Sequence, residues 1–429
     1  MRLLPLLALA ASLAACGRPR PNVLLLVMDT TRGDRVSVNG YARPTTPHLA
    51  ELAKTGVTFR DAWAPCCWTA PSHASLFTGL RPEHHGLTEG NRRYLDPGAV
   101  TLAERFQGKG WQTGCFTNNP NLSPAWGLVQ GFDHVEAFWE KPDRPYPWAP
   151  QTHRRALQWA LDAKAKGDPF FLFVNDMEPH LPYTPPPETA KRFLRETATE
   201  AELAEARAFD FPLNVGFLLG RTPVPPRKTA LLSDLYDAEI AEVDAALPIL
   251  LEGLKSAGLL DDTIVVITSD HGESLGEHRR FGHQFGMWRQ TLHVPLVIRY
   301  PGRFDGGRAA DDLVRLEDVP PTLLELCGLD PLANIDGASL TGGLGGRVAR
   351  GVIGTSDRYV EEMSKAYPGA DLAPVTRGVR SLREGRFHYL RDDEGGEELY
   401  DVVADPAETH DLAPKGGADL VRLRKLLEE

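Results

Sequence analysis

The chain has 429 residues, of which 42% are hydrophobic and 24% are charged, and its formal net charge at pH 7 is −11. This length accommodates one large α/β domain and a smaller appendage. The acidic balance argues against a nucleic-acid partner, because such a partner favours a basic surface.

The amino-terminal residues have the pattern of an export signal. An apolar stretch, Leu3 to Ala15, is too short to span a bilayer as a mature helix and ends in Leu-Ala-Ala-Cys. This ending resembles the lipobox of bacterial lipoproteins, in which the cysteine becomes the lipidated first residue. We expect residues 1–15 to be removed, Cys16 to be lipidated, and residues 16–21 to form a tether. The chain would then be lipid-anchored on the periplasmic side of a bacterial membrane, and the absence of Asp after Cys16 favours the outer membrane. The alternative is an ordinary secretory signal.

Four further cysteines follow this segment: Cys66, Cys67, Cys115 and Cys327. An oxidising compartment permits disulfides, but the sequence does not choose among the three pairings. Their spacing does not indicate a structural zinc site.

Two apolar runs lead to carboxylates. Val23 to Met28 precedes Asp29, and Ile264 to Thr268 precedes Asp270 and His271. Such runs suit strands buried on both faces of a parallel sheet, in which ligands bind beyond the carboxyl ends of the strands. We therefore expect the three side chains to meet in one crevice and to hold one divalent metal ion. These residue types suit Zn²⁺, Mn²⁺ or Ca²⁺, and geometry decides between them.

A hydroxyl-bearing segment lies between the two runs. Pro71 suits the first turn of a helix, which places Thr69 just before the helix amino terminus, where an oxyanion is favoured. A hydroxyl beside a metal can be deprotonated and can attack phosphorus or sulfur. Thr69 is therefore predicted to be both a metal ligand and the nucleophile.

These segments together resemble the sulfatase family of the alkaline-phosphatase superfamily, and the resemblance covers nearly the whole chain after residue 21. It implies an α/β fold, an alkaline-phosphatase-like α/β/α sandwich with a small α+β C-terminal subdomain. The implied division is a catalytic domain over residues 22–330 and the subdomain over residues 331–429. The resemblance rests on Asp29-Thr30, Pro71 to Gly79, Pro179 to Tyr183, Ser269 to Glu273, Pro295 to Arg299, Glu398 to Asp401 and Asp405-Pro406.

The departures from the family pattern bear on the chemistry. Typical sulfatases carry Cys-x-Pro-Ser-Arg, whose cysteine is oxidised to formylglycine. Alignment on Pro71 puts Thr69 at the cysteine position and His73 at the arginine position, whereas Cys67 lies two residues too early. The chain therefore resembles the threonine-nucleophile branches, which include phosphodiesterases and phospholipid head-group transferases. The usual Asp-Asp metal pair is also broken, because Thr30 follows the first acid. By position, His73 is expected to bind substrate.

The resemblance also implies functional roles for two further histidines. His180 and His283 occupy positions that bind the ester and stabilise charge on the transferred group or protonate the leaving oxygen. With Asp176 they also match the ligand set of a second zinc in two-metal phosphodiesterases. We favour a single metal and keep the second as an alternative.

Two other segments carry structural expectations. Residues 184–230 resemble the variable insertions that cover family active sites and choose substrates. Residues 235–254 predict an amphipathic helix in which Pro248 causes a kink or an early stop.

The sequence thus predicts a metal-dependent hydrolase of a phosphate or sulfate ester that works through a covalent intermediate on Thr69. A phosphoester is favoured because the formylglycine precursor is missing at its position. Three alternatives remain: a true sulfatase that uses a modified Cys67, a transferase that passes a phospho group to a membrane lipid or glycan, and an inactive binding protein. The expected substrate is a small-molecule, lipid or glycan ester.

Overall fold

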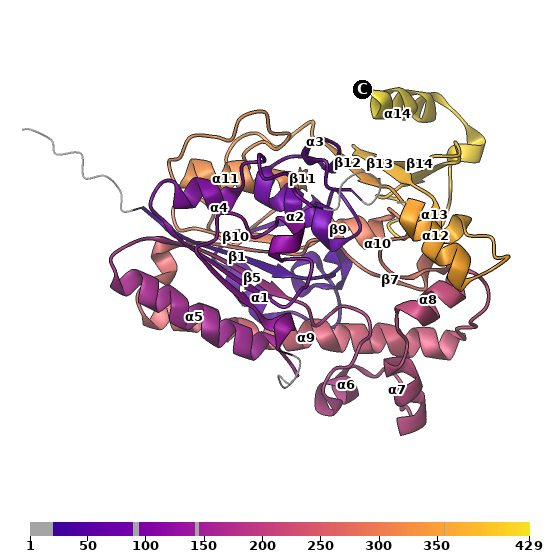
Figure 1. Ribbon diagram of the computed structural model, residues 1–429, viewed down its shortest axis with the longest axis horizontal. Helices are drawn as coiled ribbons and strands as arrows, with labels where there is room; N and C mark the ends of the chain where they lie inside the picture. Colours follow the sequence, from indigo (N-terminus) through magenta and orange to yellow (C-terminus); the bar gives the residue numbers. More distant parts are fainter. Residues whose placement is uncertain (1–19, 89–93, 142–145, 356) are drawn as a thin grey trace, which may run out of the picture.

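The computed structural model describes residues 20–88, 94–141, 146–355 and 357–429, so the predicted signal segment and Cys16 lie outside the described residues. Its centre is a mixed sheet that runs through the molecule (Figure 1). The strand order is β11 (Arg308–Arg315), β2 (Val57–Trp63), β10 (Leu296–Arg299), β6 (Thr263–Thr268), β1 (Asn22–Met28), β5 (Phe170–Asp176), β3 (Gln112–Thr117) and β4 (His134–Ala137), with β9 (His293–Val294) paired to β2.

The two acid-bearing strands lie side by side at the middle of this sheet. β1 pairs in parallel with both β5 and β6, and β3 pairs in parallel with β5. Alternate residues of β1 enter the cores on opposite faces, since Leu25 packs on one side and Leu24 and Leu26 on the other. The prediction that these apolar runs are strands buried on both faces is confirmed.

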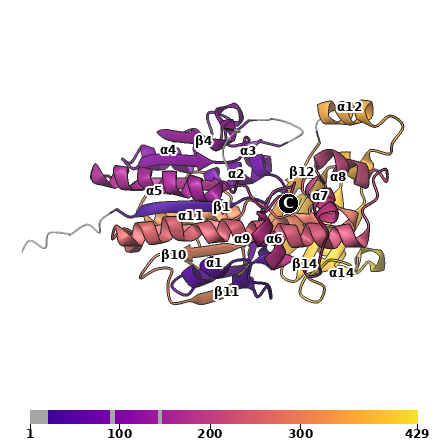
Figure 2. The same cartoon turned by 90° about the horizontal axis from the view of Figure 1, so that it is seen from below.

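Helices cover both faces of the sheet, as Figures 1 and 2 show, so the predicted α/β/α sandwich is confirmed. One face carries α1 (Pro47–Ala53), α5 (Ala149–Ala165) and α9 (Pro226–Ser256), and the other carries α2 (Thr69–Thr78), α4 (Leu102–Gln107) and α11 (Val319–Leu326). None of the described helices is both long enough and apolar enough to cross a membrane.

The expected early stop at Pro248 is wrong, because α9 continues through it to Ser256. A proline inside a helix removes one backbone hydrogen bond but does not remove the packing of its neighbours. Leu247 and Leu250 on either side are fully buried against the sheet, and this burial holds the helix together.

Smaller elements surround the carboxyl edge of the sheet. These are α3 (Pro82–His85), α6 (Pro187–Phe193), α7 (Glu200–Arg207), α8 (Phe211–Leu218), β7 (Ser274–Leu275), β8 (Phe281–Gly282) and α10 (Arg289–Leu292). A second, antiparallel sheet forms the C-terminal subdomain, which confirms the small α+β appendage. It comprises β12 (Val348–Ile353), β13 (Val379–Glu384), β14 (Phe387–Asp392) and β15 (Glu397–Asp401), with α12 (Asp357–Ala366) and α13 (Ala373–Thr376) inserted after β12, and α14 (Ala418–Glu428) packed on the sheet.

Candidate active site

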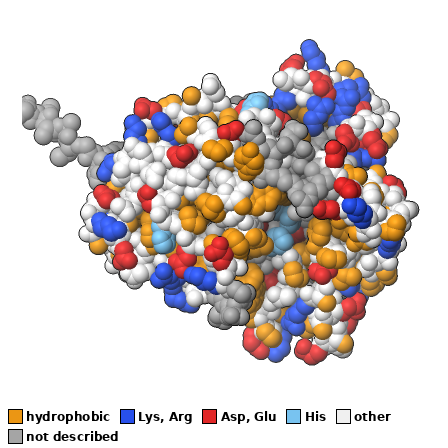
Figure 3. Space-filling view, viewed as in Figure 1, with side chains coloured by type: hydrophobic (Ala, Val, Ile, Leu, Met, Phe, Trp, Pro, Cys, Tyr) orange, Lys and Arg blue, Asp and Glu red, His pale blue; other side chains and the backbone are white. Residues whose placement is uncertain are grey.

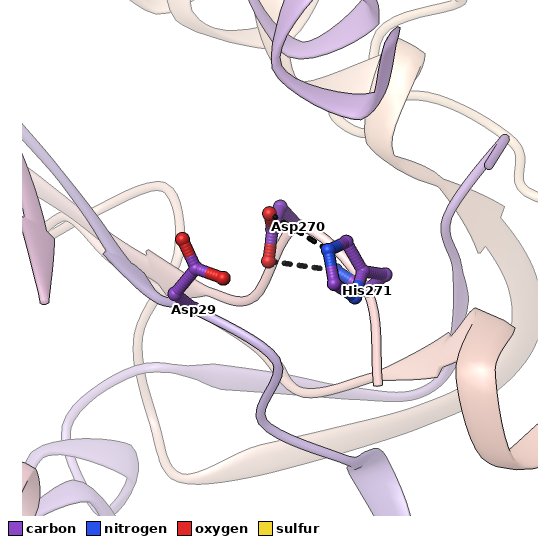
Figure 4. Close-up of side chains that lie close together, drawn as sticks. All are labelled: Asp29, Asp270 and His271. Atoms are coloured by element: carbon purple, nitrogen blue, oxygen red, sulfur yellow. Dashed lines mark hydrogen bonds and ion pairs between the residues drawn. The ribbon is translucent and has the colours of Figure 1, made fainter. Parts of the chain in front are cut away.

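Two acids and a histidine meet at the carboxyl edge of the central strands. Asp29 directly follows β1, and Asp270 follows β6 by two residues, so the parallel pairing of the strands brings both to one place. Figure 4 shows Asp29, Asp270 and His271 facing one another, and their ligand atoms all lie within 4.8 Å of one another. All three side chains are fully buried. The sequence therefore predicted correctly that these residues come together at one edge of the sheet.

The atoms of this cluster that have no hydrogen-bond partner fit a divalent cation. Asp29 Oδ1, Asp270 Oδ2 and His271 Nε2 are buried and have no hydrogen-bond partner among the described residues. Unpaired buried carboxylate oxygens are costly unless a cation neutralises them. His271 Nδ1 faces the Gly272 carbonyl oxygen at 3.0 Å, which leaves Nε2 as the ligand atom. Burial lowers the pKa of His271 to about 3, so the imidazole is neutral at pH 7, as a metal ligand must be.

The second oxygen of Asp270 fixes the orientation of that carboxylate. Asp270 Oδ1 accepts hydrogen bonds from the backbone N–H groups of Thr30 at 3.1 Å and His271 at 2.9 Å. Thr30 reaches it with a left-handed backbone, at φ 55°, which a β-branched residue rarely adopts. The Tyr236 hydroxyl donates to the Thr30 carbonyl at 2.6 Å and stabilises this conformation. Thr30, which stands where typical family members have a second acid, thus orients Asp270 through its backbone.

The predicted nucleophile lies beside this cluster. Thr69 is the first residue of α2, and its side chain is almost completely buried. The Asn119 Nδ2 group donates to Asp29 Oδ2 at 2.8 Å and to Thr69 Oγ1 at 3.3 Å, so one amide joins the acid and the hydroxyl. The structure therefore brings Thr69 together with Asp29.

Two asparagines in this arrangement were missed in the sequence. Asn119 follows β3, and Asn175 is the penultimate residue of β5; its Nδ2 donates to Asp29 Oδ2 at 3.0 Å. Both amides therefore donate to the same oxygen of Asp29, and its other oxygen, Oδ1, has no hydrogen-bond partner among the described residues. Their positions at the carboxyl ends of strands were the available signal.

We predict that Asn119→Ala lowers kcat/KM by about 100-fold, because it removes a donor that orients both Thr69 and Asp29. Asn121→Ala is a matched control, since Asn121 contacts Asn119 only through its own backbone N–H, at 2.9 Å. Steady-state kinetics of the two variants test this. Equal losses in both variants would contradict a specific role for Asn119.

His73 lies next to Thr69, four residues further along α2. Its Nδ1 atom is 2.9 Å from the Thr69 carbonyl oxygen and 3.5 Å from Asp270 Oδ2. The ring is fully buried and packs edge-on against Phe77 and Phe173. The structure therefore places His73 where it supports Thr69 and Asp270, and its expected contact with substrate stays a prediction.

His180 and His283 line up next to the cluster. The ring centroids of His180 and His283 are 4.9 Å apart, and those of His271 and His283 are 4.5 Å apart. His283 Nδ1 lies 3.1 Å from Glu273 Oε1, a carboxyl whose pKa burial raises to about 7. Both predicted histidines thus lie beside the candidate metal ligands. Glu273, which the sequence reading passed over, orients one of them.

The alternative of a second metal on Asp176, His180 and His283 is not supported. Asp176 Oδ2 is 2.7 Å from His153 Nε2, and His153 Nδ1 in turn lies 2.9 Å from the Ala246 carbonyl oxygen. Successive side chains of a strand point to opposite faces, so Asn175 faces Asp29 and Asp176 faces α5. Within the described residues, Asp29, Asp270 and His271 are the one cluster with metal-ligand spacing.

The four cysteines within the described residues are buried and unpaired. The Cys67 carbonyl accepts a hydrogen bond from the Gln284 N–H at 3.2 Å. This bond ties the segment before Thr69 to the segment after His283.

Comparison with known proteins agrees with this geometry. A model of the sulfatase family matches residues 21–329, and a model of the C-terminal region of N-sulphoglucosamine sulphohydrolase matches residues 276–428. The chain belongs to the sulfatase family. It is accordingly an ester hydrolase of the alkaline-phosphatase superfamily.

Individual relatives differ in the ester that they are named for. The N-acetylglucosamine-6-O-sulfatase of Bacteroides thetaiotaomicron is 26% identical, with 100% of this chain and 90% of the relative covered. The ulvan-active sulfatase of Formosa agariphila is 27% identical over 92% of this chain and 78% of its own. The phosphonate monoester hydrolase of Agrobacterium radiobacter is 25% identical, with a TM-score of 0.72 and 95% of each chain covered. A protein solved in complex with its substrate D-glucosamine-2-N,6-O-disulfate has the same fold, at 22% identity, 95% and 96% coverage and a TM-score of 0.75.

Proposed function

We propose that this sulfatase-family hydrolase cleaves a phosphate or sulfate ester by nucleophilic attack of Thr69, with a phosphoester as the preferred substrate. One observation carries the proposal: the Asn119 amide joins the hydroxyl of Thr69 to Asp29, whose other oxygen is buried and unpaired. A hydroxyl held beside a site for a divalent cation, at the amino terminus of a helix, is placed to act as a nucleophile.

Asp29, Asp270, His271 and the Thr69 hydroxyl would hold the metal. A divalent ion in this position supplies positive charge that acidifies a neighbouring hydroxyl and withdraws electrons from the ester. Its identity, whether Zn²⁺, Mn²⁺ or Ca²⁺, depends on coordination geometry.

The residues of the chain account for the remaining steps. Thr69 Oγ forms a bond to phosphorus as the bond from phosphorus to the ester oxygen breaks, and the hydroxyl gives up its proton. The departing oxygen takes up the proton that Thr69 gives up and leaves as an alcohol, while an N–H of His180 or His283 donates a hydrogen bond to that oxygen. Water then releases the phospho group from Thr69, and the free hydroxyl is restored. Transfer of the same group to a lipid or glycan hydroxyl would follow the same first step.

Sulfate is the second candidate, favoured by the names of the curated relatives. Cleavage of a sulfate ester would use either Thr69 or an oxidised Cys67 as the nucleophile. Cys67 is fully buried and lies before the helix that Thr69 begins. The 25%-identical phosphonate monoester hydrolase supports the phosphorus ester instead.

Turnover of matched p-nitrophenyl esters separates these candidates. The metal-reconstituted chain without residues 1–20 should cleave a phosphate monoester, a phosphate diester or a phenylphosphonate ester at least about tenfold faster than the sulfate. A higher rate on the sulfate would reverse the preference proposed here.

Lipidation of Cys16 and a periplasmic location belong to the same proposal. The support is the predicted lipobox and tether, after which β1 begins at Asn22. Cys16→Ser should move the chain from the membrane fraction to the soluble fraction; unchanged membrane association would count against the anchor.

A further inference from the structure

A cavity apart from the candidate active site lies between the central sheet and the C-terminal subdomain. It has a volume of about 600 Å³, and none of the candidate catalytic, metal-binding or substrate-binding residues lines it. Its walls come from β2, β11, α10, β13 and the loop before β12. Four arginines line it: Arg60, Arg289, Arg347 and Arg383. The cavity therefore carries the donors that recognise an oxyanion.

Arg289 is the arginine of this cavity whose positive charge is unmatched. Its guanidinium forms no hydrogen bond or ion pair with a described residue, and its backbone N–H donates to Glu408 Oε2 at 2.6 Å. Arg383 is 4% exposed and pairs with Asp61 at 3.1 Å, and its buried Nε atom has no hydrogen-bond partner within the described part of the chain. Burial lowers the pKa of Arg383, and the charge of Arg289 lowers it further, although Asp61 opposes this shift. The two guanidinium groups thus repel each other, and a bound anion would relieve the repulsion.

The carboxylates that line the cavity leave this charge unmatched. Three of the four are paired with arginines: Asp61 with Arg383, Asp311 with Arg60, and Glu384 with Arg422. Arg347 pairs with Asp318 at 2.9 Å. The fourth acid, Asp312 on β11, is exposed and forms no ion pair with a described residue. Solvent screens an exposed charge more strongly than a partly buried one such as Arg289, so the cavity favours an anion.

A glycine-rich loop supplies backbone donors to the same cavity. Residues 341–347 read Thr-Gly-Gly-Leu-Gly-Gly-Arg, and Gly345 and Gly346 line the cavity. The N–H groups of these two glycines donate to none of the described residues. A Cβ atom added at either position would meet no heavy atom within 4 Å, so packing does not require glycine there, and the bare backbone is open to a ligand. Consecutive N–H groups beside a left-handed residue such as Gly346, at φ 78°, form concavities that bind anions.

We propose that this cavity is a second site, which binds a phosphate-type oxyanion group. The proposal goes beyond the chemistry at Thr69 and does not depend on it. Guanidinium and backbone N–H groups together form the charge-assisted hydrogen bonds that hold such a group. The volume far exceeds that of one phosphate ion and falls in the range of sites for larger ligands, so we expect the group to be carried on a larger molecule. In Figure 3, Lys and Arg side chains also gather over the C-terminal subdomain, at the upper right.

Calorimetric titration of the metal-loaded chain with inorganic phosphate at low salt tests the site. Arg289→Gln should weaken one binding event by about tenfold, because it removes the unmatched charge. Asp312→Asn should strengthen the same event by about threefold, because it removes a like charge. Arg154→Gln should leave it unchanged: Arg154 is also exposed and has no ion pair with a described residue, but it lies on α5.

Short-chain polyphosphate separates the two sources of the group. Binding at least about tenfold tighter than that of inorganic phosphate, and weakened by Arg289→Gln, would identify a phosphate carried on a larger molecule. Equal affinity per phosphate, with the same response to the variants, would identify the free ion in the same cavity. Phosphate binding that responds to neither Arg289→Gln nor Asp312→Asn would overturn the inference. So would a parallel loss of ester turnover in Arg289→Gln, because the affected event would then belong to the candidate active site.

Discussion

Thr69→Ala should lower turnover of the preferred ester by at least about 10⁴-fold, because it removes the atom that forms the covalent intermediate. The fold should survive the change. Thr69 is the first residue of α2, where alanine is tolerated, and its hydroxyl takes part in one long hydrogen bond, with Asn119 at 3.3 Å. Steady-state kinetics and thermal unfolding of the same preparation give the two readouts.

Thr69→Ser is the matched control for this prediction. It keeps a hydroxyl at the same position and should retain activity within about 100-fold of wild type, since the nucleophilic atom is preserved and only its methyl neighbour is lost. Near-wild-type activity in Thr69→Ala would remove Thr69 as the nucleophile. If the activity then disappears in Cys67→Ser, the modified cysteine takes its place.

Asp270→Asn should weaken binding of the divalent ion by at least about 100-fold, because an amide replaces a charged ligand while the side-chain shape is kept. Activity should fall in parallel and recover in part at high metal concentration. Metal content after dialysis and titration of the metal-free chain with Zn²⁺ or Mn²⁺ measure this directly.

Stability separates a metal ligand from a structural acid in the same variant. In the metal-free chain, Asp270 Oδ2 is a buried carboxylate oxygen without a hydrogen-bond partner. Burial raises the pKa of this carboxyl, as expected for a charge that the fold alone does not stabilise. Metal-free Asp270→Asn should therefore unfold at a Tm no lower than that of metal-free wild type. A large loss of stability together with unchanged metal content would contradict the ligand assignment.

The residues of the site that could be predicted from the sequence are those that follow the carboxyl ends of strands. Asp29 and Asp270 each follow an uninterrupted apolar run, and such runs pack as neighbouring parallel strands whose carboxyl ends share an edge. The pairing of β1 with β6 then decides that the two acids meet. Thr69 was identifiable because a proline two residues later marks the helix start.

The positions of the other site residues depend on the order of the strands in the sheet and on the direction of each side chain. A local sequence pattern does not determine either of these. Asn119 reaches Asp29 because β3 pairs with β5 and β5 pairs with β1, the strand that Asp29 follows. The alternative of a second metal relied on the spacing of Asp176 to His180, but Asp176 is the last residue of β5 and its carboxylate contacts His153 on α5. One residue along a strand reverses the face, so spacing alone does not place such a carboxylate. Residues 184–230 contain α6, α7, α8 and the start of α9, and the position of α8 beside Phe281 could not be predicted from the sequence.

The measurement that tests the central claim most directly is the mass of the peptide that carries Thr69 after rapid acid quenching during turnover. The account predicts a phospho group, or a sulfo group with a sulfate substrate, on Thr69, present in wild type and absent in Thr69→Ala. The group found on another residue, or an oxidised Cys67 in the resting chain together with an unmodified Thr69, would contradict it.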